Sequence, residues 1–227
     1  MKRSQINEAL RWAKDLLEKT NIRLPEWAYW SLDEWKQNKD KIDTIEKVML
    51  GWDITDYAEG DFLKLGTVLF TLRNGDQKDS SIGVPYAEKL IILHEGQSLP
   101  CHFHYSKTED IITRAAGVMG IELYKATDDY EIDKKSDVTV YMDGVKTVIG
   151  PGEKILVKPG SSITLTPYMY HRFWAEPGYG DVVIGEVSAV NDDNVDNHFN
   201  PPLNRFSTVE EDEAILHPLC NEYGKVL

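Results

Sequence analysis

The chain has 227 residues, of which 41% are hydrophobic and 28% are charged, so it carries enough apolar side chains to form a buried core. Its formal net charge of -13 repels nucleic-acid backbones and anionic membranes, and no local basic cluster opposes that field. No uncharged apolar run approaches the roughly 20 residues that span a bilayer. The sequence therefore predicts a soluble protein with neither nucleic-acid nor membrane partners.

Cysteine usage and the N-terminal residues bear on the compartment. Cys101 and Cys220 lie far apart, and a single possible pair is not typical of a secreted disulfide scaffold. The N-terminal residues form a pattern that charged side chains interrupt from Glu8 onward, rather than an apolar signal segment. We expect a cytoplasmic protein.

The first 60 residues have the pattern of helices. Between residues 6 and 17 apolar side chains recur at steps of three and four, which predicts an amphipathic helix with Ser4 as its N-cap. Pro25 ends this pattern, and the spacing of aromatic side chains over residues 27–35 predicts a second, short helix. We expect these aromatic side chains to pack in the core or against a second subunit rather than against a sugar.

After Gly60 the pattern changes to short strands separated by turn residues such as Asp143-Gly144 and Pro159-Gly160. The expected strands are residues 68–72, 90–93, 118–124, 138–142, 146–149, 154–157, 162–165 and 182–187. Many short strands after a helical start predict one mainly β domain, a barrel or sandwich. In this interpretation residues 1–60 form a helical extension, residues 61–190 form the barrel, and residues 191–227 wrap around it as loops and a short helix.

The most informative segment runs from Gly96 to Glu109 and contains His102 and His104. Side chains two positions apart on a strand point to the same face, so both imidazoles can reach one ion. Glu109 follows after enough residues for the chain to turn and bring a carboxylate back from the next strand. An isolated His-x-His pair is a weak indication of a metal site, and the glycine and glutamate at these offsets strengthen it.

This segment resembles the first motif of the cupin superfamily, in which a glycine, a His-x-His pair, a glutamate and a second glycine follow one another; Gly96 begins the match and Gly117 falls one residue late. The second cupin motif supplies a histidine after a Pro/Gly turn, and its nearest match is His171. The resemblance implies a mainly β cupin (jelly-roll) barrel with N-terminal helices and a C-terminal extension. The implied metal ligands are His102, His104, Glu109 and His171.

Three imidazoles and one carboxylate leave two positions of an octahedron open. Such donors suit manganese, iron(II), cobalt, nickel or zinc rather than calcium or magnesium, and the residues do not choose among the five. The remaining histidines have weaker claims: His94 lies at a strand end, and His198 and His217 are expected at the surface of the tail. Cys101 alternates out of phase with the two histidines and is expected to face away from the ion.

A closer resemblance is to the D-lyxose ketol-isomerases. It covers most of the chain, including its length, the helical start and the segments at residues 102–110, 185–193, 196–197 and 201–206. It implies interconversion of D-lyxose with D-xylulose, and of D-mannose with D-fructose, through a cis-enediol. It also implies one divalent metal ion, with manganese preferred, and a homodimer.

Four side chains are candidates for the sugar chemistry. We expect Lys107 at the pocket rim, either donating to a sugar oxygen or simply solvated. Glu186 lies in an apolar run, where a buried carboxylate is costly unless it is paired or functional, which favours a catalytic role. Glu109 can also serve as the base, and the residues do not distinguish between the two carboxylates. Asp193 is expected to bind sugar hydroxyls from a loop, although a plain turn is an alternative.

Two other functions would use the same ligands. An iron(II)-dependent cupin dioxygenase would consume oxygen, and a non-enzymatic sugar-binding cupin would have no turnover. The charged residues expected in the pocket favour an enzyme. No Gly-rich phosphate loop or basic cluster accompanies the motif, so an unphosphorylated sugar is the expected substrate.

Overall fold

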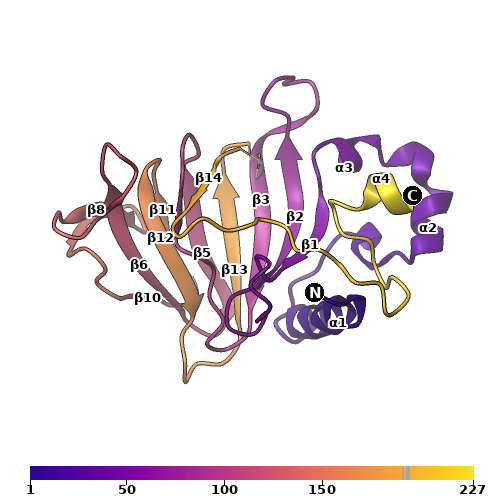
Figure 1. Ribbon diagram of the computed structural model, residues 1–227, viewed down its shortest axis with the longest axis horizontal. Coiled ribbons are helices and arrows are strands. Elements are labelled where there is room, and N and C mark those ends of the chain that lie inside the picture. Colours follow the sequence, from indigo (N-terminus) through magenta and orange to yellow (C-terminus); the bar gives the residue numbers. More distant parts are fainter. Residues whose placement is uncertain (191, 193–194) are drawn as a thin grey trace.

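The computed structural model describes residues 1–190, 192 and 195–227, and within them the chain forms two facing antiparallel sheets with helices packed at one end (Figure 1). The helices are α1 (Arg3–Lys19), α2 (Leu32–Gln37), α3 (Asp43–Lys47) and α4 (Tyr223–Val226), with short 3₁₀ turns at Glu26–Tyr29 and Lys39–Lys41. Of the helices in these residues, none is long and apolar enough to cross a membrane.

The larger sheet has the strand order β1-β2-β3-β13-β5-β11-β8-β9. Its strands are β1 (Gly51–Thr55), β2 (Thr67–Gly75), β3 (Gly83–Leu93), β13 (Val182–Ser188), β5 (Glu109–Ala116), β11 (Ser162–Leu165), β8 (Val138–Met142) and β9 (Val145–Ile149). The smaller sheet has the order β10-β6-β12-β4-β14, and β7 also pairs with β6. Its strands are β10 (Ile155–Val157), β6 (Met119–Ala126), β12 (Met169–Ala175), β4 (His102–His104), β14 (Asn197–Phe199) and β7 (Ile132–Asp133). The expectation of a mainly β jelly-roll barrel is confirmed.

Alternation along the strands separates two apolar cores. On β3, Ile91 and Leu93 belong to the core between the two sheets, which we call the barrel interior. Leu90 and Ile92 on the same strand point the other way and pack in the core beneath α1. Because side chains alternate with period two, β2, β3 and β13 each supply both cores, and the phase of a residue on these strands tells which core it faces.

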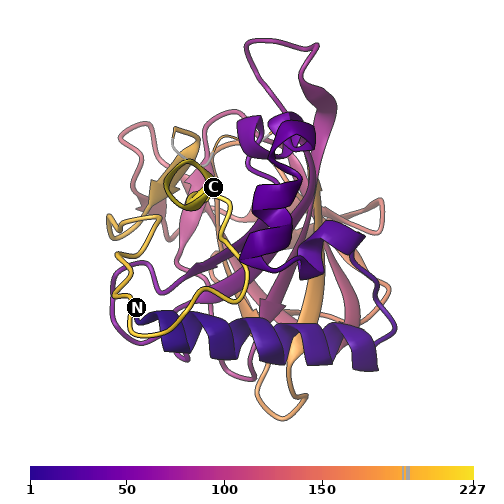
Figure 2. The same ribbon diagram turned by 90° about the vertical axis from the view of Figure 1, so that its right-hand side faces the viewer.

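Figure 2 shows α1 along its full length, packed across the molecule below the other helices. Ile6 and Leu17 lie on its buried face, as the apolar spacing predicts. The expected N-cap is wrong: the helix begins at Arg3 with Lys2 as N-cap, and Ser4 lies inside the first turn. The N–H and Oγ of Ser4 both donate to the Asp212 carboxylate at 2.8 Å, so a distant part of the chain satisfies the group that was expected to cap locally.

A buried ionic cluster fastens the C-terminal segment to α1. We call Arg3, Glu211 and Glu222 the terminal clasp. The fully buried guanidinium of Arg3 donates to Glu211 at 2.9 and 2.7 Å and to Glu222 at 3.2 and 2.5 Å. The bonds to Glu211, together with those to Glu222, outweigh burial and raise the pKa of Arg3. The Arg3 guanidinium is therefore charged and is paired within the protein.

The barrel takes strands from both segments that were expected to lie outside it. β1 belongs to the segment expected to be helical, and it pairs with β2 at the edge of the larger sheet. β14 belongs to the segment expected to be loop and short helix, and it pairs with β4. Both strands are short, and pairing with a distant neighbour rather than a local pattern stabilises them.

The aromatic and histidine side chains outside the barrel interior partly follow expectation. Trp35 is buried against Trp27 and Tyr223, in a core of its own at the helical end. His217 was expected at the surface and is instead buried, with its Nδ1 2.8 Å from the carbonyl oxygen of Trp30. The tail in which it lies is packed under the helices, which the polar composition of that segment does not reveal.

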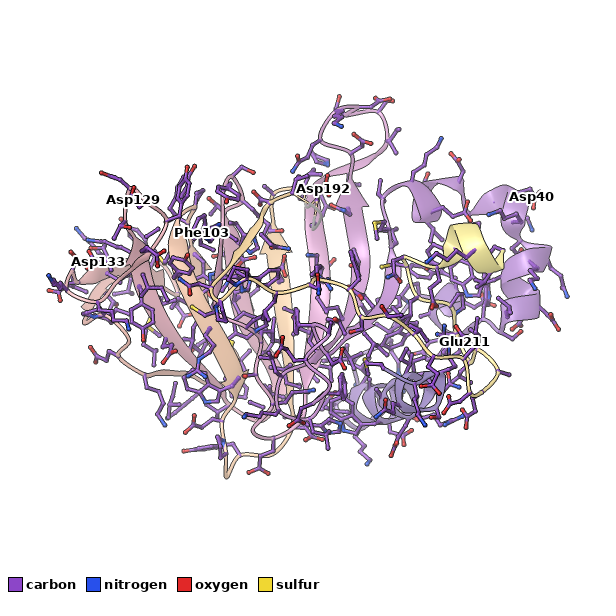
Figure 3. All side chains as sticks on the ribbon, viewed as in Figure 1. Asp40, Phe103, Asp129, Asp133, Asp192 and Glu211 are labelled. Carbon is purple, nitrogen blue, oxygen red and sulfur yellow. The ribbon has the colours of Figure 1, made fainter. Side chains whose placement is uncertain are left out.

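Much of the acidic excess lies at the periphery. Figure 3 labels Asp40 at the helical end and Asp129 at the opposite end of the molecule, and both are exposed. Glu211 is also largely exposed although it belongs to the terminal clasp. The net negative charge therefore acts mainly as a solvated surface, as the sequence indicated.

Candidate metal centre

Two strands of the smaller sheet bring three imidazoles together in the barrel interior. His102 and His104 share one face of β4, and the antiparallel partner β12 places His171 directly opposite His102. All three are buried. Each offers one ring nitrogen, and these nitrogens lie within 4.8 Å of one another, so the group can hold a metal ion.

Hydrogen bonds fix which nitrogen faces the neighbouring rings in two of the three imidazoles, His102 and His171. The Nδ1–H of His102 donates to the Pro100 carbonyl oxygen at 2.9 Å, and that of His171 donates to the Met169 carbonyl oxygen at 3.0 Å. A carbonyl oxygen only accepts, so in the neutral rings both Nε2 atoms carry a bare lone pair. These two Nε2 atoms are 3.1 Å apart. Two facing lone pairs repel each other, and a cation between the rings would relieve that repulsion.

The protonation of the rings agrees with this geometry. Burial, aided by the neighbouring imidazoles, lowers the pKa of His102 well below its ordinary value. Burial also lowers the pKa of His171 to about 4, against an opposing effect from the Glu109 carboxylate. Both rings are therefore neutral at neutral pH, which is the form that binds a metal ion.

A carboxylate completes the donor set. Glu109 begins β5, and its Oε1 lies 3.4 Å from the Nε2 of His104 and 3.4 Å from the Nε2 of His171. Burial opposes ionisation of Glu109, but Lys107 and the imidazoles outweigh it and hold the pKa of this carboxyl well below its usual range. The structure thus brings together all four residues that the cupin resemblance implied as ligands, and nitrogen and oxygen donors of this kind fit a divalent transition metal.

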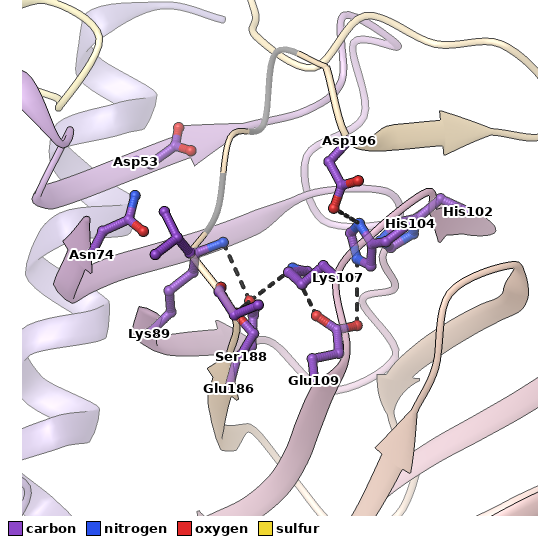
Figure 4. A network of polar contacts seen from close by, with 12 residues as sticks. Asp53, Asn74, Lys89, His102, His104, Lys107, Glu109, Glu186, Ser188 and Asp196 are labelled. Carbon is purple, nitrogen blue, oxygen red and sulfur yellow. Dashed lines mark hydrogen bonds and ion pairs between the residues drawn. The ribbon is translucent and has the colours of Figure 1, made fainter. Parts of the chain in front are cut away.

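Lys107 lies deep in the site, and its expected position at the pocket rim is wrong. Only 3% of the residue is exposed, and its Nζ lies 2.7 Å from Glu109 Oε2 and 2.9 Å from Glu186 Oε1 (Figure 4). The side chain folds back from the loop between β4 and β5 because two buried carboxylates attract it there. One ammonium therefore bridges both acidic residues of the site.

Glu186 faces the barrel interior, as its apolar surroundings in the sequence indicated. It is in phase with Ile184 on β13, and it lies opposite Lys89 on β3, whose Nζ is 3.3 Å from Oε1. Burial again opposes ionisation, but Lys107 and then Lys89 outweigh it and lower the pKa of Glu186. Glu186 is therefore a buried carboxylate that stays ionised without contacting an imidazole in the described network.

Two further residues belong to this network and were missed in the sequence. Lys89 carries a readable signal, because it is in phase with Ile91 and Leu93 on β3 and must share their interior face. Asp196 carries none, since it belongs to the tail. Its Oδ1 accepts from the backbone N–H and the hydroxyl of Ser106 at 2.9 Å. Its Oδ2 lies 3.8 Å from His104 Nδ1, and both of these buried atoms lack a hydrogen-bond partner.

The open space at the imidazoles is small, about 40 Å³. Strands of both sheets line it, and the tail contributes Asn197, Phe199 and Arg205. Cys101 is not among its lining residues, and burial raises the pKa of that thiol to about 12, so no thiolate acts there. Asp193, the residue expected to bind sugar hydroxyls, lies outside the described residues.

Comparison with known proteins gives a consistent family. The D-lyxose isomerase family model matches residues 1–223. A D-lyxose/D-mannose isomerase of Escherichia coli O157:H7 is 42% identical over 224 residues, and one of Serratia proteamaculans is 41% identical; each match covers 98% of both chains.

Solved structures extend the comparison to the fold. An L-ribose isomerase variant of Acinetobacter sp. DL28, in complex with L-ribose, superposes with a TM-score of 0.56 at 16% identity, over 92% of this chain and 98% of that one. An L-ribose isomerase of Cellulomonas parahominis gives 0.55 at 15% identity over the same shares. At such identities the likeness shows a shared fold, and the cupin architecture expected from the sequence is confirmed.

Proposed function

The chain belongs to the D-lyxose isomerase family, and from this we propose that it interconverts D-lyxose with D-xylulose and D-mannose with D-fructose. Membership of that family makes it an aldose–ketose isomerase. The single observation that carries the mechanism is the pairing of a buried imidazole triad with two ionised carboxylates, Glu109 and Glu186, that share the ammonium of Lys107.

The proposed ion is manganese, held by His102, His104, His171 and Glu109. The neutral rings and the ionised carboxylate support this donor set, and the mixture of nitrogen and oxygen ligands favours a first-row transition ion over calcium or magnesium. A divalent ion at this position would polarise two neighbouring sugar oxygens and balance the negative charge that develops on them. The other steps belong to the side chains around it.

Glu186 is the proposed base. As a carboxylate it accepts the proton from C2 of the open-chain aldose, and the electron pair of that C–H bond forms the double bond between C1 and C2. O1 gains a proton, which gives the cis-enediol. O2 then loses its proton, and Glu186 returns the carbon-bound proton to C1, which leaves the ketose. One base acting on one face of the enediol accounts for both transfers.

Lys107 and Lys89 hold this base and serve the sugar oxygens. Their ammonium groups keep Glu186 ionised in a buried setting, as the lowered pKa of its carboxyl indicates. The Lys107 ammonium lies between the two carboxylates of the site, and we assign it a contact with a sugar oxygen next to the reacting carbons. Glu109, which faces two imidazoles, has its lone pairs directed toward the ion and is the weaker candidate for the base.

Asp193 is proposed to bind sugar hydroxyls, with support from the sequence alone. We also propose that the chain acts as a homodimer in the cytoplasm. The sequence offers a single possible pair of cysteines, Cys101 and Cys220, which is not typical of a secreted disulfide scaffold and supports a reducing compartment. Light scattering on the purified protein gives the mass of the assembly and tests the dimer.

Proton NMR of D-lyxose in heavy water tests the activity. Metal-stripped protein should leave the aldose unchanged, and added manganese should produce D-xylulose with deuterium at C1. Deuterium incorporation is expected because the proton on Glu186 exchanges with solvent between the two transfers. Ketose formed without deuterium would contradict the enediol route, and no ketose with any divalent ion would contradict the isomerase assignment. Oxygen uptake with iron(II) would then test the dioxygenase alternative.

A further inference from the structure

The space beside the imidazoles is too small for the proposed substrate. About 40 Å³ holds one or two water molecules, since a water occupies about 30 Å³ in the liquid. A sugar whose first two carbons lie at the metal centre must therefore extend into neighbouring space. The described residues offer such a space: a cavity of about 210 Å³ that shares Leu69, Lys89 and Arg205 with the metal centre. We call it the adjoining cavity.

The strand alternation explains why the adjoining cavity is polar. On β1, Trp52 and Ile54 pack in the core beneath α1, so Asp53 between them faces the opposite side of the sheet. The next strands supply Thr71 and Asn74 from β2. Figure 4 shows Asp53 and Asn74 on the side of Lys89 that is away from the histidines. Carboxylate, hydroxyl and amide groups on one concave surface are the groups that bind sugar hydroxyls.

Asp53 has an acceptor that the protein does not use. Its Oδ2 accepts from Arg205 Nη2 at 2.5 Å, which fixes the carboxylate in place. Its Oδ1 is buried and has no hydrogen-bond partner. A buried carboxylate oxygen without a donor is costly to leave unpaired, so such an atom in a cavity indicates a donor that arrives with the ligand. A hydroxyl supplies that donor to Oδ1. Because Lys47, Lys78, Lys89 and Arg205 also line the cavity, a phosphate is the alternative that the test must exclude.

We propose that the adjoining cavity binds the end of the sugar farthest from the carbonyl, and that Asp53 Oδ1 accepts a hydrogen bond from the terminal hydroxyl of a hexose. This inference rests on the proposed function and names the residue that reads the far end of its substrate. Asp53 takes no part in proton transfer. Its effect is on which sugars bind productively.

The test compares D-mannose with 6-deoxy-D-mannose, which lacks only the terminal hydroxyl. In the wild type, kcat/KM should fall at least about tenfold when the hydroxyl is removed, which corresponds to roughly 1.4 kcal/mol. In Asp53→Ala the two sugars should differ by less than about twofold, because the partner of that hydroxyl is gone. Turnover of D-lyxose by the wild type, measured in the same assay, reports on the proposed function separately.

Asp56→Ala is the matched control. Asp56 is as buried as Asp53, follows the same strand and bonds to Ser207 of the same tail, but it lines neither cavity. It should keep the discrimination between the two sugars while removing a comparable tie to the tail. If Asp53→Ala does not fold, Asp53→Asn keeps the shape and should reduce the discrimination at least about threefold.

Three results would overturn the inference. One is equal turnover of D-mannose and 6-deoxy-D-mannose by the wild type, including no turnover of either. Another is unchanged discrimination in a folded Asp53 variant. The last is faster turnover of D-mannose 6-phosphate than of D-mannose, which would assign the cavity to a phosphate. In each case D-lyxose turnover would leave the proposed isomerisation of D-lyxose standing, whereas absence of D-mannose turnover would remove the D-mannose part of the proposed function.

Discussion

Two buried clusters of polar side chains in this molecule differ in whether the protein itself supplies all of their partners. In the terminal clasp, Arg3 donates to two oxygens of Glu211 and two of Glu222, so its donors meet acceptors of the protein itself. In the metal centre, the bare Nε2 atoms of His102 and His171 face each other at 3.1 Å. The first arrangement is complete without a ligand, and the second is complementary to a cation. The contrast separates buried charges that stabilise the fold from those that support chemistry.

The largest expected effect comes from removing one imidazole of the metal centre. His102→Ala should lose the bound metal and lower kcat/KM by at least about 10³-fold, because a divalent ion with one ligand missing is no longer fixed in the pocket. Metal analysis of the purified variant and the lyxose assay measure both. His94→Ala is the matched control, since His94 stacks on Trp12 away from the centre and should keep metal and activity. Full metal occupancy in His102→Ala would contradict the ligand assignment.

Glu186→Gln tests whether Glu186 acts as the base and not as a metal ligand. The amide keeps the shape of the carboxylate but cannot accept the proton from C2, so kcat should fall by about 10²- to 10⁴-fold. Metal content should remain at the wild-type level because Glu186 contacts Lys89 and Lys107 rather than the imidazoles. A variant that loses metal together with turnover would instead indicate that Glu186 maintains the centre itself.

For the terminal clasp we expect a loss of stability without a loss of activity. Arg3→Ala leaves the buried Glu222 carboxylate with the Leu219 N–H but without a cation to balance its charge, which costs about 3 kcal/mol of unfolding free energy. The lower part of the usual range applies because the side chain of Glu211 is 55% exposed and can turn to water. For a chain of this size the melting temperature should fall by roughly 10 °C. Activity at 25 °C should be unchanged.

Arg11→Ala on the same helix is the control for the clasp. Its guanidinium is largely exposed and lies 4.0 Å from Glu213, so its loss should cost less than about 1 kcal/mol. Thermal unfolding of the two variants, followed by circular dichroism, measures the difference. Equal melting temperatures would show that the terminal clasp does not stabilise the fold. Loss of turnover in folded Arg3→Ala would show that the clasp also supports activity.

Acid should lower the free energy of unfolding of the metal-free protein, because the pKa of His171 is lower in the folded chain than in the unfolded chain. The folded ring binds its proton at about pH 4 and the unfolded one at about 6.5, so the unfolded chain holds more protons between these values. The free energy of unfolding should therefore fall by about 3 kcal/mol from this ring alone as the pH drops through that window. His171→Asn in metal-stripped protein should have a flatter dependence. Denaturant unfolding at several pH values measures both slopes, and identical slopes would contradict the assignment.

The strand pattern gave two of the proposed metal ligands, His102 and His104, because it reports the face of each side chain, whereas His171 came from the resemblance to the second cupin motif. Two histidines at alternate positions must share a face, and Glu186 in an apolar run must either face the interior or be solvated at an edge. The pattern cannot report which distant segments pair. β1 and β14 are short, and their partners β2 and β4 stabilise them, so they were assigned to the helical extension and the tail.

The sequence also could not predict where long side chains and side chains from distant segments end. Lys107 lies in a loop, where the sequence gives no face, and its long side chain ends between two carboxylates rather than at the rim. Asp53 lines the adjoining cavity from β1 and Asp196 lies beside His104 from the tail, so neither could be assigned before those segments were placed. Lys89 is different: its alternation with Ile91 was readable in the sequence, and it was missed because the expected strand began at residue 90, whereas β3 begins at Gly83.

The smallest expected effect concerns Asp196, which links the tail to the metal centre. Its Oδ2 lies 3.8 Å from His104 Nδ1, and a carboxylate there favours the ring form with hydrogen on Nδ1 and a bare Nε2 toward the ion. Asp196→Asn places an amide that can donate to Nδ1 and so favour the wrong tautomer. Metal affinity, measured by competition with a chelator, should fall about 10- to 100-fold, while the melting temperature of the metal-free protein stays within about 2 °C of the wild type. Ser106→Ala, which removes only a hydroxyl bond to the other oxygen, should have a smaller effect on affinity. Unchanged affinity in Asp196→Asn would place Asp196 with the terminal clasp, among charges that fasten the tail and do no more.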